Sequence, residues 1–180
     1  MKPDRMGYSL LPFTRATASH TRWGVVYWNE FEASNVLTKC DGTEWNAGAF
    51  APVSLIVGWD IPQHCVVGLW LSPDMAPETG VVKVEIRDDG DDSVLCAHEA
   101  VWTRGGVYSV LFPRAVHTSA VRLTFTQSPS WIALFWVEAW QFRGEPTVVK
   151  TPVSLVANTG LLQQRRRSAR SLLRISSPRR

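Results

Sequence analysis

The side chains that most often carry catalysis or metal binding are few in this chain and far apart. No two cysteines form a CxxC pair, and no two histidines have the spacing of metal ligands. The seven residues are His20, His64, His98, His117, Cys40, Cys65 and Cys96. There is also no GxSxG, P-loop, GxGxxG or HExxH motif. We therefore expect a protein that is not an enzyme. The one catalytic alternative left open is a hydrolase built on Asp41 and Glu138.

Aromatic and arginine side chains in predicted loops offer a different chemistry, which is binding without reaction. The chain has nine tryptophans, and one of them stands two residues before Arg104 and close to the pair Gly105-Gly106. An aromatic ring stacks on the C–H face of a sugar, and a guanidinium donates hydrogen bonds to its hydroxyls. The candidate ligand-binding residues are Trp23, Trp28, Asn29, Phe50, Trp102 and Arg104. We expect Trp45, Trp59 and Trp131 to lie in the core.

Alternating apolar and polar residues predict the strands that position these loops. The alternation is clear in Val81–Arg87, where Val82, Val84 and Ile86 share one face. The Asp-Gly pair at 41–42 and the DDGDD run at 88–92 predict turns. The other predicted strands are Ala16–Trp28, Leu55–Asp60, Cys65–Leu71, Ser93–Trp102, Val107–Phe112, Ala120–Phe125 and Ser128–Trp140. Because no helical period persists over 16–142, the fold class is all-β.

Charge divides the chain into two parts. Residues 1–142 carry ten basic and fifteen acidic side chains, whereas residues 143–180 carry nine basic and one acidic. We therefore expect a lead-in at 1–15, a β-sandwich at 16–142 and a basic C-terminal arm or tail at 143–180. The tail is predicted to be a solvated, poorly ordered segment. The alternative is a partly helical segment that docks on a partner through residues 160–180. Without a nucleic-acid motif, we expect no specific nucleic-acid binding.

The apolar runs are too short to suggest a membrane span or an export signal. The longest lies near residues 131–137, and the first fifteen residues lack the apolar stretch of a signal peptide. We therefore expect no transmembrane segment and no signal peptide.

Two stretches together resemble a known family. DGTEWNAGAFAP (41–52) and SPSWIALFWVEAW (128–140) resemble discoidin-like domains, also called coagulation-factor type C domains, of the galactose-binding-like superfamily. The short, single-domain versions in bacterial and phage proteins are the most similar, and the resemblance spans residues 16–142. The residues that carry it are Ala16–Ser19, Asn35, Asp41, Gly42, Trp45, Asn46-Ala47-Gly48, Ala51-Pro52, Ser128-Pro129-Ser130-Trp131 and Glu138.

The resemblance implies a fold, a function and a metal. The fold is an antiparallel jelly-roll β-sandwich, and the function is non-catalytic binding of a carbohydrate, here a cell-surface polysaccharide, through loops at one end. Family members often hold a structural calcium, for which the matching residues are Asp41, Thr43 and Glu138. Only two residues separate the Asp-Gly pair from Trp45, which is fewer than the family pattern has, so the calcium loop is shortened here.

A second function stays open beside glycan binding. The same sandwich would suit a structural or adaptor protein of an assembly, such as a phage particle, with residues 160–180 contacting a protein partner. Under this hypothesis the protein belongs to a phage virion or to a bacterial cytoplasmic or surface-associated assembly.

Overall fold

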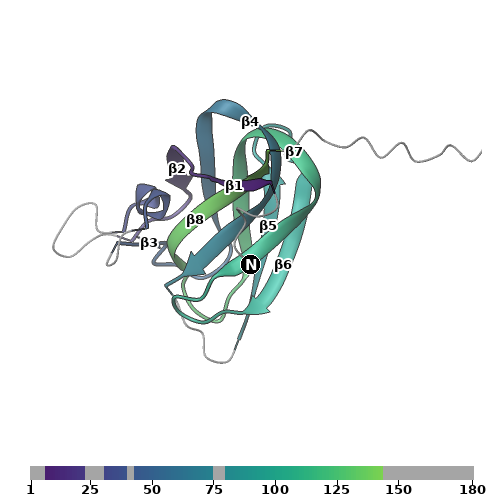
Figure 1. Ribbon diagram of the computed structural model, residues 1–180. Helices are drawn as coiled ribbons and strands as arrows, with labels where there is room; N and C mark the ends of the chain where they lie inside the picture. Colours follow the sequence, from purple (N-terminus) through teal and green to yellow (C-terminus); the bar gives the residue numbers. More distant parts are fainter. Residues whose placement is uncertain (1–6, 23–30, 40–42, 75–79, 144–180) are drawn as a thin grey trace, which may run out of the picture. The chain divides into compact units, whose positions relative to one another are not determined.

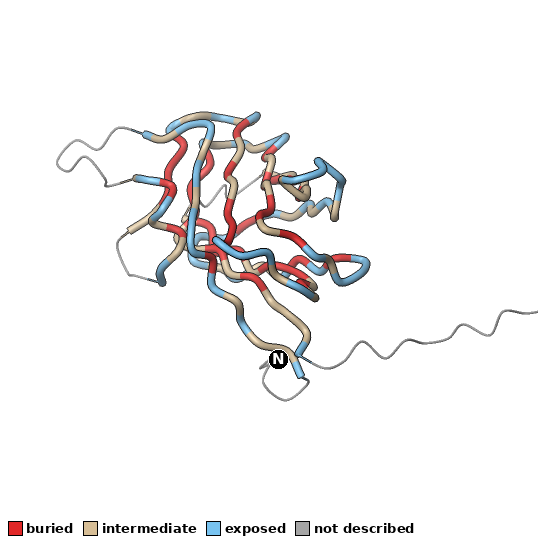
Figure 2. Tube along the Cα trace, turned by 90° about the horizontal axis from the view of Figure 1, so that it is seen from above, coloured by how far each residue is buried: buried red, intermediate tan, exposed pale blue. Residues whose placement is uncertain are grey.

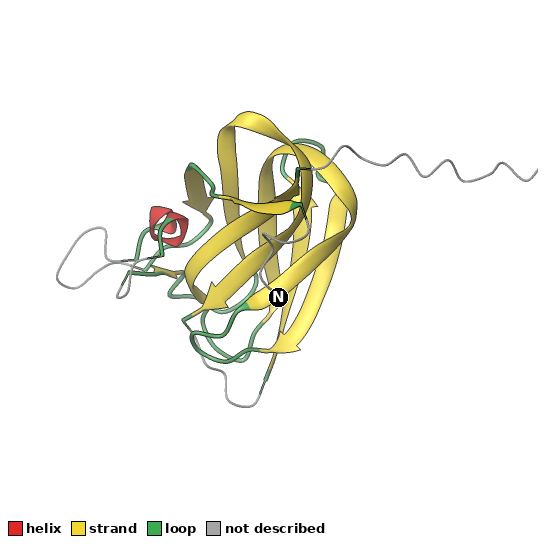
Figure 3. Cartoon of the chain, in the orientation of Figure 1, coloured by secondary structure: helices red, strands yellow, loops and turns green. Residues whose placement is uncertain are grey.

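The structure is a computed structural model, and it describes residues 7–22, 31–39, 43–74 and 80–143. All described elements belong to one compact unit. The elements are β1 (Tyr8–Leu11), β2 (Arg15–Ala18), the 3₁₀ helix η2 (Ala33–Leu37), β3 (Trp45–Asn46), β4 (Val53–Pro73), β5 (Val81–Asp88), β6 (Val94–Val101), β7 (Tyr108–Gln127) and β8 (Ala133–Phe142). The described part is thus nearly all antiparallel β-sheet, which confirms the predicted fold class (Figure 3).

Two very long strands fold one hydrogen-bonded sheet into two layers. The strand order is β1-β8-β4-β7-β5-β6, with β2 also paired to β4 and β3 to β8. The first part of β4 pairs with β2 and with residues 120–125 of β7, whereas its last part pairs with β8 and residues 108–111. Three register shifts between Gly58 and Gly68 mark the bend, where Cys65 has a φ of 56°. Figure 1 shows β4 and β7 arching from one layer to the other.

These long strands correct the sequence prediction. Leu55–Asp60 and Cys65–Leu71 are parts of β4, and Val107–Phe112 and Ala120–Phe125 are almost wholly parts of β7. Polar residues and Pro62 at the bend of β4 resemble a turn in sequence, yet the chain bends there without leaving the sheet. The predicted lead-in also contains β1, which pairs with β8 from Tyr8–Phe142 to Leu11–Ala139.

The core lies between the layers and follows the alternation read from the sequence. On β5, Val82, Val84 and Ile86 are buried and their neighbours are only partly so. Trp45 and Trp59 are buried as predicted. Figure 2 shows buried positions recurring along the strands, and many of the exposed residues at the turns. Burial of these side chains supplies the main stabilising term of the unit.

Four described loops meet at one end of the sandwich. We call this the loop end and define it by residues 19–22, 43–52, 102–107 and 128–132. Backbone hydrogen bonds join the segments: Arg22 N to Asn46 O (2.7 Å), Ala47 N to Ile132 O (2.9 Å) and Gly105 N to Pro73 O (2.8 Å). Because these bonds cross between loops, the sandwich holds side chains from distant parts of the chain at fixed positions.

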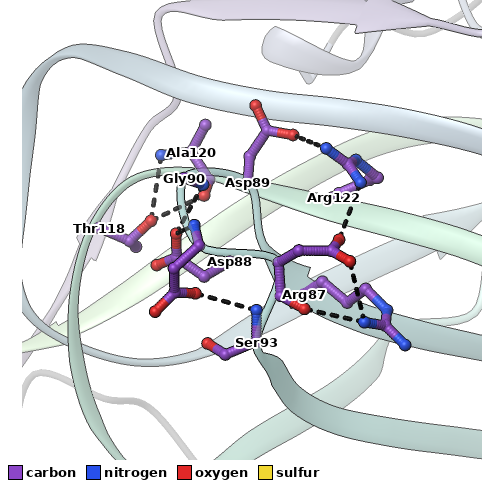
Figure 4. Close-up of polar contacts among 10 residues, drawn as sticks. Arg87, Asp88, Asp89, Gly90, Ser93, Thr118, Ala120 and Arg122 are labelled. Carbon is purple, nitrogen blue, oxygen red and sulfur yellow. Dashed lines mark hydrogen bonds and ion pairs between the residues drawn. The ribbon is translucent and has the colours of Figure 1, made fainter.

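The opposite end holds the acidic turn, where two of the four aspartates are paired with arginines. Arg122 bonds Asp89 (Nη2 to Oδ1, 2.6 Å) and Asp92 (Nη1 to Oδ1, 3.0 Å), and Arg87 also bonds Asp92. Figure 4 shows both arginines reaching into the turn. The Asp88 carboxylate accepts from the backbone N–H of Gly90. This turn is therefore a structural cap of the β5–β6 hairpin.

Candidate functional site

An arginine held between two aromatic rings marks the loop end. The Arg22 guanidinium carbon lies 5.1 Å from the centroid of the Phe31 ring and 5.4 Å from that of Trp131. We call these three residues the first cluster. Trp131 is 47% exposed, and Arg22 is exposed as well. Both contacts are within the range of cation–π interaction, which orients the planar guanidinium against the rings.

The local backbone explains why the first cluster forms. Arg22 is fixed by its N–H bond to Asn46 of β3. Trp131 is fixed through its neighbour Ile132, which exchanges backbone bonds with Ala47 and Ala49 (2.9 and 3.2 Å). Phe50 follows Ala49 directly and is 63% exposed. The loop end therefore presents two large, accessible aromatic side chains on neighbouring segments, beside a cation.

A second arginine lies at the same end, with an acidic partner. Arg104 Nε is 2.6 Å from Asp74 Oδ1, and its guanidinium is 5.8 Å from the Phe135 ring. The Arg104 side chain is exposed, whereas Asp74 is largely buried. Asp74 is itself fixed by a backbone bond from its N–H to Ala133 O (3.1 Å). We call Arg104, Asp74, Phe135 and Glu44 the second cluster.

Glu44 contributes a carboxyl that holds a proton near neutral pH. Burial, followed by a hydrogen bond to Asp74, raises the pKa of Glu44 to about 7. The Asn46 amide donates to Glu44 Oε1 (3.2 Å), which acts in the opposite direction. Two neighbouring carboxyl groups that share a site disfavour double ionisation, so Glu44 keeps its proton to a higher pH than an exposed glutamate does.

Asn46 connects the two clusters. Its backbone carbonyl accepts from Arg22, and its side-chain amide donates to Glu44. The amide oxygen accepts from Gly48 N (2.8 Å), which fixes the orientation of the buried side chain. Asn46, a buried residue of the two-residue strand β3, thus links the first cluster to the second and fixes their relative position.

This arrangement has the chemistry of a binding site. The exposed rings offer flat apolar surfaces, the two guanidinium groups donate hydrogen bonds, and the second cluster adds carboxyl acceptors. The residues lie on loops that a rigid sandwich supports, which is a common place for recognition.

The sequence-predicted site residues fall into three groups. Phe50 and Arg104 lie exposed at the loop end, so their predicted role in binding stays a prediction with suitable geometry. Trp102 is wrong as a contact residue, because it is 1% exposed and packs on Tyr108 and Phe125 in the core. Trp23, Trp28 and Asn29 lie outside the described residues.

Sequence reasoning missed several residues of the two clusters. Trp131 was predicted to be buried as part of a strand, but β8 begins only at Ala133 and leaves it in the preceding loop. The SPSW turn, in which Ser128 Oγ donates to Ser130 O (2.6 Å), was the available signal for this. Arg22 stands next to Trp23 in sequence, which is the same signal that selected Arg104. Glu44 and Asp74 carried no local signal.

The predicted calcium ligands do not form a metal site in the described part of the chain. Glu138 Oε2 lies 2.5 Å from Lys39 Nζ, so its charge is balanced by an ammonium group. Thr43 has an interaction partner of its own, and Asp41 lies outside the described residues. No group of three or more His, Cys, Asp or Glu side chains in the described ranges is placed to hold a metal ion. Whether Asp41, Thr43 and Glu138 hold calcium together stays a prediction, because Asp41 lies outside the described residues.

Comparison with known proteins identifies the fold. No family model matches the chain, and no curated protein matches its sequence significantly. Among solved structures, it is similar to the family 32 carbohydrate-binding module of C. perfringens NanJ in complex with galactose. That similarity has a TM-score of 0.58 and 14% identity over 74% of this chain and 99% of that one.

Two further modules show the same similarity. Chitosan-binding module 1 from the chitosanase/glucanase of Paenibacillus sp. IK-5 has a TM-score of 0.53 and 23% identity, over 72% and 95% of the two chains. The family 32 module of AlyQ in complex with 4,5-unsaturated mannuronic acid has a TM-score of 0.57 and 14% identity, over 73% and 97%. The chain thus shares the antiparallel β-sandwich fold of these modules, which confirms the predicted fold.

Proposed function

We propose that the protein is a non-catalytic glycan-binding module whose site is the loop end. The observation that carries this proposal is the first cluster, in which a guanidinium is stacked beside the half-exposed ring of Trp131. Phe50 adds a second exposed ring, and Arg104 adds a second donor. Rings and fixed donors on one rigid surface are the elements of sugar recognition.

The similar structures support glycan binding, but they do not identify which sugar this protein binds. Their bound or named ligands are galactose, chitosan and an unsaturated mannuronic acid, which are neutral, cationic and anionic. The shared feature is a sandwich of this fold used as a binding module. The alternative of an adaptor that contacts an assembly through residues 160–180 lies outside the described residues and stays a prediction.

Binding to a panel of polysaccharides tests the proposal. The full chain would be titrated against galactan, chitosan, alginate and pectin by affinity electrophoresis and calorimetry. Trp131→Ala and Phe50→Ala are expected to weaken binding about tenfold each, since loss of one stacked ring removes about 1–2 kcal/mol.

The matched control is Ile61→Ala. Ile61 is 72% exposed on the bend of β4, away from the loop end, so its substitution should leave binding unchanged. Absence of binding to every polysaccharide, with or without calcium, would overturn the proposal. If Trp131→Ala and Phe50→Ala both bind as tightly as the wild type, the binding site lies elsewhere on the molecule. That result would overturn the assignment of the site to the loop end.

A further inference from the structure

Some arginines of the described residues are paired with carboxylates, whereas Arg22 lies at the loop end without such a pair. Arg104 pairs with Asp74, and Arg122 pairs with Asp89. No described carboxylate lies within ion-pair distance of Arg22, although the residue stands at the centre of the first cluster. An arginine that is positioned by two rings and has no ion-pair partner among the described residues places a positive charge at the proposed site.

The geometry of the cluster leaves the donors of Arg22 available. The guanidinium carbon of Arg22 lies 5.1 Å from the centroid of the Phe31 ring and 5.4 Å from the centroid of the Trp131 ring. The N–H groups of arginine lie in the plane of the guanidinium and form a fork that matches two carboxylate oxygens. Such a bidentate, charge-assisted contact is stronger than a hydrogen bond to a neutral hydroxyl. The rings also reduce the conformational freedom that the side chain would lose on binding.

The nearby acidic groups do not cancel this positive charge. Asp74 is paired with Arg104, so its charge is already balanced. Burial and the bond to Asp74 raise the pKa of Glu44 to about 7, so only part of the molecules carry its negative charge at neutral pH. An anionic ligand approaching Arg22 would therefore meet less repulsion from the second cluster than two ionised carboxylates would cause.

We infer that the loop end recognises an acidic glycan, with Arg22 bonding the carboxylate of a hexuronate while the Trp131 ring supports the sugar. This inference rests on the proposed function and adds the chemical class of the ligand. It makes Arg22 the specificity-determining residue, because a neutral sugar would leave its charge desolvated and unpaired.

Matched acidic and neutral polysaccharides test the inference on the full chain. The probes are polygalacturonate and alginate, each compared with its methyl-esterified form, which keeps the backbone and removes the charge. We expect at least tenfold tighter binding of one acidic form over its ester. Arg22→Gln should reduce that preference to less than threefold, and Arg22→Lys should give an intermediate value, because lysine keeps the charge without the fork.

Two controls separate this site from general attraction of polyanions. Arg114→Gln removes one exposed positive charge from the opposite end of the sandwich. The triple variant Arg165→Gln, Arg166→Gln, Arg167→Gln reduces the charge of the basic tail. Both should keep the acid preference. Loss of the preference in either control would overturn the inference, because charge alone would then explain it.

The outcomes distinguish the inference from the proposed function. If the protein binds neutral glycans or both forms equally, the acidic class is wrong and the binding module stands. If Arg22→Gln keeps the preference, Arg22 is not the determinant and the inference fails. If no polysaccharide binds at all, the proposed function itself fails.

Discussion

The ammonium of Lys39 lies 2.5 Å from Glu138 Oε2 and 4.3 Å from the centroid of the Trp136 ring. Glu138 lies on β8 directly opposite Trp70 of β4, and Trp70 packs edge-on against Trp140 at 4.2 Å. Only 18% of the Glu138 side chain is exposed. A mostly buried carboxylate needs a cation, and in this protein Lys39 of the same chain supplies it.

The first prediction is that folding does not depend on calcium. Addition of calcium or EDTA should leave the Tm of the wild type unchanged, because Lys39 already balances the Glu138 charge. Lys39→Met should lower the free energy of unfolding by about 1–2 kcal/mol, since it leaves a mostly buried carboxylate unpaired. Thermal and urea unfolding measure both effects.

The control for this prediction is Lys83→Met. Lys83 pairs with Glu99 at 3.1 Å, but both side chains are well exposed, so the cost should stay below about 0.5 kcal/mol. A clear rise of the wild-type Tm on adding calcium would contradict the role assigned to Lys39.

The second prediction concerns pH. The pKa of Glu44 is raised from 4.5 to about 7, so the folded protein holds this proton more tightly than the unfolded chain. The resulting stabilisation is fully present below pH 4.5 and is lost as the pH rises through 7. Between pH 5 and pH 8 the free energy of unfolding of Glu44→Gln should therefore rise by about 1 kcal/mol relative to that of the wild type. The difference is small because the site is partly solvated.

Urea unfolding at several pH values measures this difference. Comparing the two proteins cancels the contribution of His98, whose pKa is lowered by burial and which titrates in both. Glu99→Gln, which removes an exposed carboxylate, should follow the wild-type profile. Parallel profiles for Glu44→Gln and the wild type would disprove the shared proton.

The third prediction separates two tryptophans with opposite roles. Trp102→Ala should cost about 3–5 kcal/mol of stability, because the side chain is 1% exposed and stacks on Tyr108 at 5.6 Å. Trp131→Ala should cost less than about 1 kcal/mol while it weakens glycan binding. Measuring unfolding and binding for both variants tests the pair. A stable Trp102→Ala protein would show that the ring does not belong to the core.

The fourth prediction concerns the close approach of β4 and β7. A Cβ on Gly68 would lie 2.4 Å from the carbonyl oxygen of Val110, which the paired backbone cannot move cheaply. Gly68→Ala should destabilise the fold by about 2–3 kcal/mol. In Gly90→Ala the nearest atom is the flexible Asp88 carboxylate at 3.1 Å, and little change in Tm is expected. Similar Tm values for the two variants would contradict the tight pairing.

The fold class was predictable from local pattern, but the strand count was not. Burial of Val82, Val84 and Ile86 follows directly from their alternation. The merging of four predicted strands into β4 and β7 depends on pairing between residues that are distant in sequence, as in Leu55 with Leu123. Such pairing leaves no mark in a local window.

In the candidate site, too, only the features with a local sequence cue were predictable. Arg104 was selected because it stands near Trp102 and two glycines, a local cue, and it does lie at the loop end. The partners of Arg104 come from separate loops, Asp74 before β5 and Glu44 before β3. Trp131 was misplaced because its exposure depends on where β8 begins, which a strand pattern fixes only to within a few residues.

The sharing of β4 and β7 between the layers has a mechanical consequence. Neither layer can peel away without breaking ladders in the other, because each long strand belongs to both. Amide hydrogens of both layers should therefore exchange with solvent through one common opening event. A tether pulled at the loop end would load the whole sandwich at once, which suits a module that must stay attached to a large polymer under shear.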